Sequence, residues 1–428
     1  MIEKSVLPNG LTILTESLPY LHSVSVGLFV EAGSQDENLA ERGVSHFIEH
    51  MLFKGTKRHS AKEIAEIVDA SGSRMNAYTS KEYTCFYVKA LDEHLELSIN
   101  ILAEMLTEST FAKEMIDRER QVILEEIKMY QDSPEDMVHD LFAKSVLEDH
   151  PLGQSIVGLE ETVAAFDQEL ILDYVNRMYV PNNMVFVVVG NVDHKKAKEL
   201  IEKNLGGLNG SNIDKCLVKP EIKGGKLIQQ KDIEQMHLVL GTDSLGRNDV
   251  RKYTLHLLDT IIGGSMSSRL FQTLREDRGL VYSTYSFHSY FDDSGLLGLY
   301  AGFSPTNLEL VTDLIVKELT TIKDTVTEDE LTRVKEQTKG SLVFSLESPS
   351  SRMTRLARNE IYFKTQITED HVLEEINKIT LADVKDLAAW QFSVDRPLAL
   401  ALMAPNNSDV DKLSALKNLN WGDLGVTN

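Results

Sequence analysis

The chain has 428 residues and a formal net charge of −22 at pH 7. Hydrophobic residues make up 42% of it and charged residues 26%, which is typical of a folded globular protein and excludes a largely disordered chain. Its length exceeds one ordinary hydrophobic core and predicts two to four domains. The acidic balance argues against binding to nucleic acid and favours basic partners.

The two cysteines, Cys85 and Cys216, are not in a C-x-x-C pair, so the sequence indicates neither a disulfide framework nor a cysteine zinc site. A reducing compartment is the simpler interpretation. The N-terminal sequence MIEKSVLPNGLTIL has neither the apolar core of a secretion signal nor the composition of a transit peptide. The most apolar run, 184–190, is too short to cross a bilayer. We therefore expect a cytoplasmic protein with no membrane contact.

Periodicity predicts an α+β unit of about two hundred residues with mainly antiparallel strands. Ser60 and Glu63 form a capping box, which predicts a helix from there to about residue 70. We expect the other elements of this unit in chain order: strands over 11–15 and 23–31, a helix over 44–54, a hairpin over 74–80 and 82–90, helices over 91–106, 111–130, 134–146 and 160–178, a strand over 184–190 and a helix to about 204.

The segment GVSHFIEHMLFKGT, residues 43–56, contains a candidate metal-binding motif. In a helix, His46, Glu49 and His50 share one face. Two imidazoles one turn apart suit a divalent metal, and a carboxylate between them can take a proton from a metal-bound water. The order is the inverse of the zinc protease motif H-E-x-x-H. Because so short a pattern also arises by chance, the site requires a third ligand.

The predicted helix over 111–130 offers that ligand. Glu119 and Glu126 are seven residues apart, so they lie on one face two turns apart. One could bind the metal while the other accepts the imidazole N–H of a ligand histidine. For this helix alone, a solvated acidic face is the simpler alternative.

The two segments together resemble the pitrilysin family of zinc peptidases, which includes insulin-degrading enzyme and the mitochondrial processing peptidase. HFIEH is followed, after 75 intervening residues, by Glu126 within ERQVILEEI, and the family has the same motifs at about the same spacing. The resemblance implies that His46, His50 and Glu126 bind one zinc ion per chain, that Glu49 is the general base and that Glu119 supports a ligand histidine. Nitrogen and oxygen ligands also admit manganese or cobalt in vitro.

Residues 206–226 are rich in Gly, Asn and Pro and predict a linker, because neither helical nor strand periodicity continues through most of them. A phosphate-binding loop is the alternative, but the segment has no Gly-Lys-Ser/Thr ending. The linker separates a first domain, 1–205, from a second, 227–428.

The second domain repeats the first. Residues 94–106 align with 307–319 at an offset of 213, and YQDSP at 130–134 resembles SLESP at 345–349. We therefore expect two homologous domains. At the first offset His46 falls on Asp259, and the second copy has no H-x-x-E-H motif. The resemblance implies that the two domains face each other as a clam shell.

The segment SRLFQTLREDRGLVYSTYS, residues 268–286, gives the second domain a role. From its residues alone, the segment predicts a helix that ends near Gly279, followed by a strand over 281–287. The family, however, places an arginine and a tyrosine seven residues apart here, and Arg275 and Tyr282 match. The resemblance implies that both bind substrate carbonyls and stabilise the oxyanion when the domains close.

The sequence RMNAYT resembles the edge strand of the family, where Asn76 and Ala77 let a peptide add as a further strand. We expect unfolded peptides or flexible tails as substrates, with a weak preference for basic ones, and by resemblance to short bacterial relatives a homodimer. The predicted function is a zinc metalloendopeptidase of the bacterial cytoplasm. The alternatives are a non-catalytic subunit of the same family and a metal-dependent hydrolase that acts on another bond.

Overall fold

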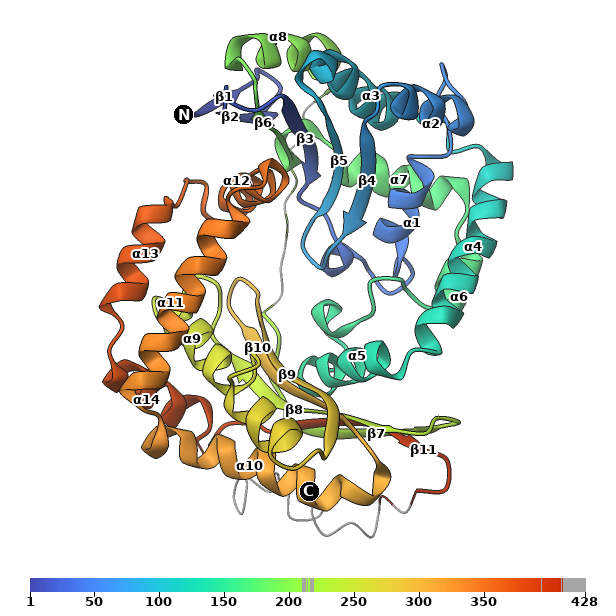
Figure 1. The fold of residues 1–428 in the computed structure, drawn as a ribbon. Helices are drawn as coiled ribbons and strands as arrows, with labels where there is room; N and C mark the ends of the chain where they lie inside the picture. The colour runs from blue at the N-terminus through green and yellow to red at the C-terminus, as the bar shows by residue number, and fades with distance from the viewer. Residues whose placement is uncertain (210–212, 214, 216–218, 394, 409, 411–428) are drawn as a thin grey trace. The chain divides into compact units, whose positions relative to one another are not determined.

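The structure is a computed structural model, and it describes residues 1–209, 213, 215, 219–393, 395–408 and 410. Contacts divide the chain into two compact units, each built of three segments (Figure 1). Unit 1 comprises Met1–Met129, Ser155–Leu217 and Val343–Ile367. Unit 2 comprises Tyr130–Gln154, Val218–Leu342 and Thr368–Asn428.

Unit 1 contains a six-stranded sheet in the order β1-β2-β6-β3-β5-β4. Its strands are β1 (Ile2–Val6), β2 (Thr12–Ser17), β3 (Ser23–Val30), β4 (Arg74–Thr79), β5 (Thr84–Leu91) and β6 (Met184–Gly190). β2 and β6 pair in parallel, and the other neighbours are antiparallel. β4 is therefore an edge strand, hydrogen-bonded within the described residues to β5.

Helices cover both faces of this sheet. They are α1 (Val44–Met51), α2 (Ala61–Ala70), α3 (Leu95–Glu108), α4 (Lys113–Gln131), α6 (Glu160–Ala165), α7 (Gln168–Met178), α8 (His194–Leu205) and α12 (Pro349–Phe363). β6, with the sequence MVFVVVG, is buried throughout because apolar side chains pack on both of its faces. Phe186 and Val188 point into the core that includes α1 and α3, whereas Val185 and Val187 point toward α12.

Unit 2 has a five-stranded sheet in the order β7-β11-β8-β10-β9. Its strands are β7 (Gly225–Lys231), β8 (Met236–Ser244), β9 (Val281–Tyr290), β10 (Gly295–Phe303) and β11 (Ala399–Pro405). Its helices are α5 (Pro134–Leu147), α9 (Lys252–Ile262), α10 (Leu308–Thr325), α11 (Glu328–Ser345), α13 (Glu369–Lys378) and α14 (Leu381–Gln391). β7 and β11 are parallel, and the other pairs are antiparallel. The α+β class with mainly antiparallel sheets is confirmed.

The internal repeat appears in both units. α5 and α12 each begin with a serine cap followed by proline: Ser133 accepts a hydrogen bond from the N–H of Asp136, and Ser348 from that of Ser351. In the sheets, the parallel pair β2 and β6 corresponds to the parallel pair β7 and β11. The segments 130–134 and 345–349 therefore correspond in structure as well as in sequence.

These two equivalent helices are exchanged between the halves of the chain. α5 belongs to the first half but packs on the sheet of unit 2 through Val138, Phe142 and Val146. α12 belongs to the second half but packs on the sheet of unit 1 through Met353 and Leu356. The predicted division of the chain into domains 1–205 and 227–428, joined by a linker over 206–226, stays a prediction. Part of that linker, together with Cys216, lies outside the described residues.

Glycine allows each exchanged helix to approach its sheet closely. A Cβ atom at Gly27 of β3 would lie 2.7 Å from Sδ of Met353 in α12. A Cβ atom at Gly241 of β8 would lie 2.7 Å from Cζ of Phe142 in α5. Both central strands therefore use glycine where a helix crosses them, which is a common reason for glycine within a strand.

Some predicted boundaries were wrong. The helix expected over 91–106 begins at Leu95, because β5 continues to Leu91 and a short 3-10 turn follows. The helix expected over 160–178 is two helices, α6 and α7, since Asp167 caps a new N-terminus by accepting a hydrogen bond from the N–H of Leu170. β1 was not predicted, and four of its five residues are exposed.

Candidate metal centre

α1 presents the H-x-x-E-H motif as the pattern predicted. Phe47, Ile48 and Met51 are buried in the core of unit 1. The opposite side of the helix carries His46 and His50, whose rings lie 4.6 Å apart between centroids. The apolar face thus fixes the helix on the unit while both imidazoles point the other way.

The N-terminus of α1 is held by a residue that the sequence analysis did not identify. The buried carboxylate of Glu37 accepts hydrogen bonds from the backbone N–H of Gly43 at 2.7 Å and of Ser45 at 2.8 Å. Burial raises the pKa of Glu37 to about 8, against the effect of these two donors. Gly43 has a φ of 94°, and a Cβ there would lie 2.8 Å from Cα of Gly158. This turn requires glycine, and it sets where α1 begins.

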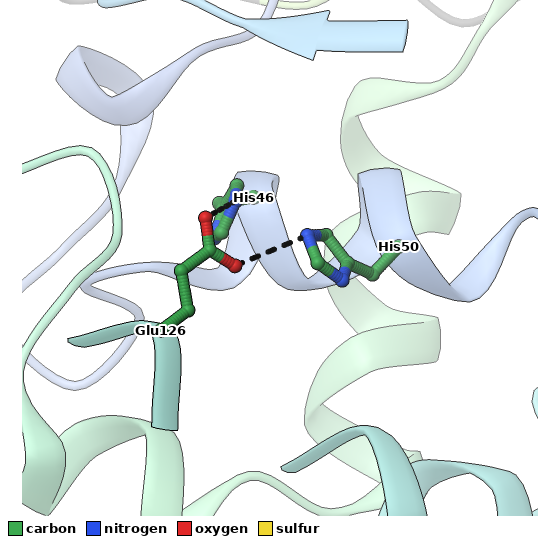
Figure 2. Close-up of side chains that lie close together, drawn as sticks. All are labelled: His46, His50 and Glu126. Atoms are coloured by element: carbon green, nitrogen blue, oxygen red, sulfur yellow. Dashed lines mark ion pairs between the residues drawn. The ribbon is translucent and has the colours of Figure 1, made fainter. Parts of the chain in front are cut away.

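Glu126 of α4 completes a three-residue cluster with both histidines (Figure 2). Its Oε1 lies 3.7 Å from Nε2 of His46, and its Oε2 lies 3.6 Å from Nε2 of His50. One atom from each residue falls within 4.8 Å of the others. Within the described part of the chain, this is the one group of three such residues found close enough to hold a metal ion.

These distances suit a zinc ion better than a direct contact. Nitrogen and oxygen atoms that share a hydrogen bond are about 2.7–3.2 Å apart, so 3.6 and 3.7 Å are too long. Ligands at about 2.0–2.2 Å from one tetrahedral zinc are roughly 3.3–3.6 Å apart. The donor set, two imidazoles and one carboxylate, is also that of a catalytic zinc with an open fourth position. The residues present therefore fit the metal.

Glu119 lies behind His50. Its Oε1 accepts a hydrogen bond from Nδ1 of His50 at 2.8 Å, which leaves Nε2 facing Glu126. Its other oxygen pairs with Lys54 at 2.7 Å. A carboxylate in this place fixes the orientation and tautomer of a ligand histidine.

Glu49 lies on the same helix and has a partner that the sequence did not reveal. The hydroxyl of Thr79, at the end of β4, donates a hydrogen bond to Oε2 of Glu49 at 2.6 Å. The partner comes from the strand beside α1 rather than from the motif. No local pattern identifies it, because the contact depends on how β4 packs against the helix.

The electrostatic surroundings favour a bound cation. Burial lowers the pKa of His46 to about 4, and the nearby His50 adds to this effect, so His46 is neutral and keeps a lone pair. Burial also lowers the pKa of His50, but the hydrogen bond and charge of Glu119 outweigh it and the pKa lies above its ordinary value. Burial raises the pKa of Glu49 against the hydrogen bond from Thr79. A divalent cation placed here would offset the negative charge of the nearby carboxylates of Glu49, Glu119 and Glu126.

The structure brings Arg275 and Tyr282 together within unit 2. Arg275 lies in a π-helical turn, Phe271–Glu276, and Tyr282 is the second residue of β9. The Arg275 guanidinium lies 5.6 Å from the centroid of the Tyr282 ring, and this tyrosine is 77% exposed. Gly279, with a φ of 58°, makes the turn between them. Their role toward substrate stays a prediction.

Asn76 and Ala77 lie in the middle of the edge strand β4. Asn76 is exposed, Ala77 is buried, and Oδ1 of Asn76 accepts a hydrogen bond from the N–H of Ala77 at 2.9 Å. An incoming strand that uses this N–H would replace the bond.

No helix in the described residues has the length and apolarity that crossing a bilayer requires. The cytoplasmic location stays a prediction.

Comparison with known proteins supports a peptidase. The model described as "Insulinase (Peptidase family M16)" matches residues 12–160, which include His46, His50 and Glu126. The model described as "Peptidase M16 inactive domain" matches residues 165–338, which include Arg275 and Tyr282. The division agrees with a metal motif in one half only.

Relatives cover almost the whole chain. The uncharacterized zinc protease YmxG of Bacillus subtilis is 43% identical over 409 residues, which span 95% of this chain and 99% of that protein. An uncharacterized zinc protease of Streptomyces coelicolor is 39% identical over 402 residues, which span 90% of this chain and 86% of that protein.

Solved structures share the fold. A protease from Helicobacter pylori has a TM-score of 0.88 at 24% identity, covering 95% of this chain and 99% of that one. A peptidase M16 inactive domain from Pseudomonas fluorescens has a TM-score of 0.87 at 19% identity, covering 95% of this chain and 98% of that one. The resemblance to the pitrilysin family is confirmed. This chain belongs to the insulinase family of peptidases, family M16, and is a zinc metalloprotease.

Proposed function

We propose that the protein is a zinc endopeptidase in which His46, His50 and Glu126 bind one zinc ion per chain. One observation carries the proposal. The carboxylate of Glu126, from α4, faces Nε2 of both histidines at 3.6 and 3.7 Å, too far for hydrogen bonds and close to the separation of ligands around one ion (Figure 2).

Glu49 is the general base in this proposal. A zinc ion held by these three residues would supply a water of pKa about 7 and would polarise the scissile carbonyl. The Glu49 carboxylate accepts the proton of the attacking water and delivers it to the leaving amine. The hydroxyl of Thr79 donates a hydrogen bond to Oε2 of Glu49, which holds the carboxylate in place.

Removal of the Glu119 carboxylate tests the support of His50. In Glu119→Gln, we expect zinc affinity to fall about 10- to 100-fold, the usual cost of losing such a partner. Peptide cleavage at saturating zinc should fall less. Competition with a zinc chelator measures the affinity. Glu114→Gln is a matched control, since Glu114 is an exposed carboxylate on the same helix. Equal zinc affinity in Glu119→Gln and the wild type would contradict the role.

Arg275 and Tyr282 are proposed to bind the substrate from the second domain. The Tyr282 hydroxyl would donate a hydrogen bond to the developing oxyanion, while Arg275 would bind a neighbouring carbonyl. The cation–π contact between them keeps the two side chains together.

Tyr282→Phe tests this proposal, because it removes one hydroxyl and leaves the ring beside Arg275. We expect kcat to fall about 10²- to 10³-fold, as for other oxyanion donors, with zinc content unchanged. The control is Tyr20→Phe, at an exposed tyrosine of unit 1. A wild-type kcat in Tyr282→Phe would rule out an oxyanion contact.

The substrates are proposed to be unfolded peptides or flexible protein tails. The free edge of β4 suits a peptide that adds as a further strand, a mode that recognises an extended backbone more than particular side chains. The net charge of −22 supports a weak preference for basic peptides. A homodimer is proposed as the assembly.

A chelator and readdition assay tests the function as a whole. Activity on a mixture of unstructured peptides should disappear when zinc is removed and return when zinc is added, and mass spectrometry should place the cuts inside the peptides. Release of single terminal residues only, or activity that survives complete removal of metal, would contradict a zinc endopeptidase.

A further inference from the structure

Unit 1 contains a cavity of about 560 Å³ beside the edge strand β4. It lies on the face of the sheet that α12 covers, and side chains of β4, β5 and α12 form its walls. Arg74 and Lys89 contribute the charged part of the lining, and Asn76, Ser351 and Thr354 contribute polar groups. The described residues that line the cavity include no acidic side chain.

Arg74 and Lys89 are directly opposite each other. In the antiparallel register of β4 and β5, Arg74 pairs with Lys89, so both side chains project from the same face of the sheet. Cβ atoms in such a pair are about 4.5–5.5 Å apart, and like charges in this position destabilise a sheet. Both residues are exposed, so solvent screens part of this repulsion, and an anion between the two side chains would offset the rest.

Neither cation has a hydrogen bond or an ion pair with any residue that the structure describes. The chain has 66 acidic and 44 basic side chains, so carboxylate partners are abundant elsewhere. Lys4, Lys54 and Lys364 of the same unit, for example, each pair with a glutamate. Two cations that share a cavity without a carboxylate therefore form a local basic site in an acidic protein.

The position of the cavity connects it to the edge strand. Along β4, the alternate residues Arg74, Asn76 and Tyr78 line the cavity, and Met75 between them also contributes to the lining. Thr79 faces the other side and donates its hydrogen bond to Glu49. A peptide added to the free edge of β4 would alternate in the same way, with every second side chain on the cavity face. The same peptide would thus reach both Glu49 and the cavity.

We propose that this cavity binds an acidic side chain of a peptide substrate extended along β4, so that the protease selects Glu or Asp at a position away from the cleaved bond. The proposal rests on the proposed peptidase function. It complements the weak preference for basic peptides, because it concerns one subsite and not the overall charge of the substrate.

The strand geometry predicts where the acid lies. Arg74 is five residues from Thr79, which contacts Glu49, and five residues of antiparallel strand span about 17 Å. We therefore expect the acid about four to six residues from the cleaved bond. Since the cavity is remote from the reacting atoms, the acid should improve KM and leave kcat almost unchanged.

Positional isomers of one peptide separate the subsite from overall charge. Each isomer has the same composition and one glutamate, which is moved from position to position on both sides of one mapped cleavage site. For the wild type, we expect the isomer with glutamate at the favoured position to have a kcat/KM about tenfold above the others, equivalent to about 1.4 kcal/mol. Equal kcat/KM for all isomers would overturn the proposal.

Charge variants then assign the preference to the two cations. In Arg74→Gln/Lys89→Gln, the tenfold preference should fall below about twofold. In Arg74→Glu/Lys89→Glu, the preference should invert toward isomers with lysine at that position, a gain that misfolding cannot produce. The matched control is Lys62→Gln/Lys195→Gln, which removes two exposed cations on α2 and α8 and should keep the glutamate preference. A preference that survives both changes at Arg74 and Lys89 would place the acid elsewhere.

A binding experiment tests the acid subsite independently of peptidase activity. If the zinc-loaded wild type cleaves none of the peptides, the peptidase proposal fails. The isomers are then titrated calorimetrically into zinc-loaded Glu49→Gln. Tighter binding of the favoured glutamate isomer, lost with Arg74→Gln/Lys89→Gln, supports the cavity as an acid subsite. Equal binding of all isomers, or no binding, overturns it.

Discussion

Glu49→Gln is expected to abolish peptide cleavage while the protein keeps one zinc ion per chain. Glutamine preserves the size of the side chain and the oxygen that accepts the hydrogen bond of Thr79, which lies 2.6 Å from the carboxylate in the structure. It cannot accept the proton of the attacking water. Loss of a general base typically costs 10²- to 10⁴-fold in rate. Zinc analysis and initial rates on one peptide measure the two quantities.

The control for this experiment is Glu66→Gln, at an exposed carboxylate on α2. This variant should keep the wild-type rate. Full activity in Glu49→Gln would contradict the assignment of the base. Loss of zinc together with activity would instead show that Glu49 contributes to metal binding.

His46→Ala, His50→Ala and Glu126→Ala are expected to lose zinc and activity together. Each change removes one of the three donors whose atoms lie within 4.8 Å of one another. Because even a residue behind a ligand is typically worth 10- to 100-fold in metal affinity, loss of a ligand should weaken binding by more than about 100-fold. Zinc content after dialysis against a weak chelator, with the rate on the same sample, tests the prediction.

Glu125→Ala provides a close comparison. Glu125 is the neighbour of Glu126 on α4, its side chain is 71% exposed, and it pairs with Lys128. This variant should keep both zinc and activity. If Glu126→Ala kept stoichiometric zinc at wild-type affinity, α4 would not supply the third ligand and the proposed centre would be wrong.

Part of the candidate metal centre could be predicted because the geometry within each helix is local. Helical periodicity alone places His46, Glu49 and His50 on one face, and it stacks Glu119 above Glu126. The meeting of the two helices is not local. The family resemblance predicts it, and the structure gives the distances between the side chains.

Contacts that depend on tertiary packing could not be predicted. Glu37 caps α1 from the preceding loop and Thr79 bonds Glu49 from β4, and neither position has a distinctive sequence pattern. Val122 of α4 is apolar but 51% exposed, because the buried stripe of this helix follows Ile116, Ile123 and Ile127 instead. Periodicity gives the direction of a stripe more reliably than its width.

The exchanged helices have a consequence for the integrity of the chain. The apolar side of α5 is completed by strands that come after the linker, and that of α12 by strands that come before it. A single proteolytic cut within 206–226 would leave two fragments, each with an uncovered sheet and an unsupported helix. Neither fragment would hold a full core alone, so their persistence would depend on reassociation and hence on concentration.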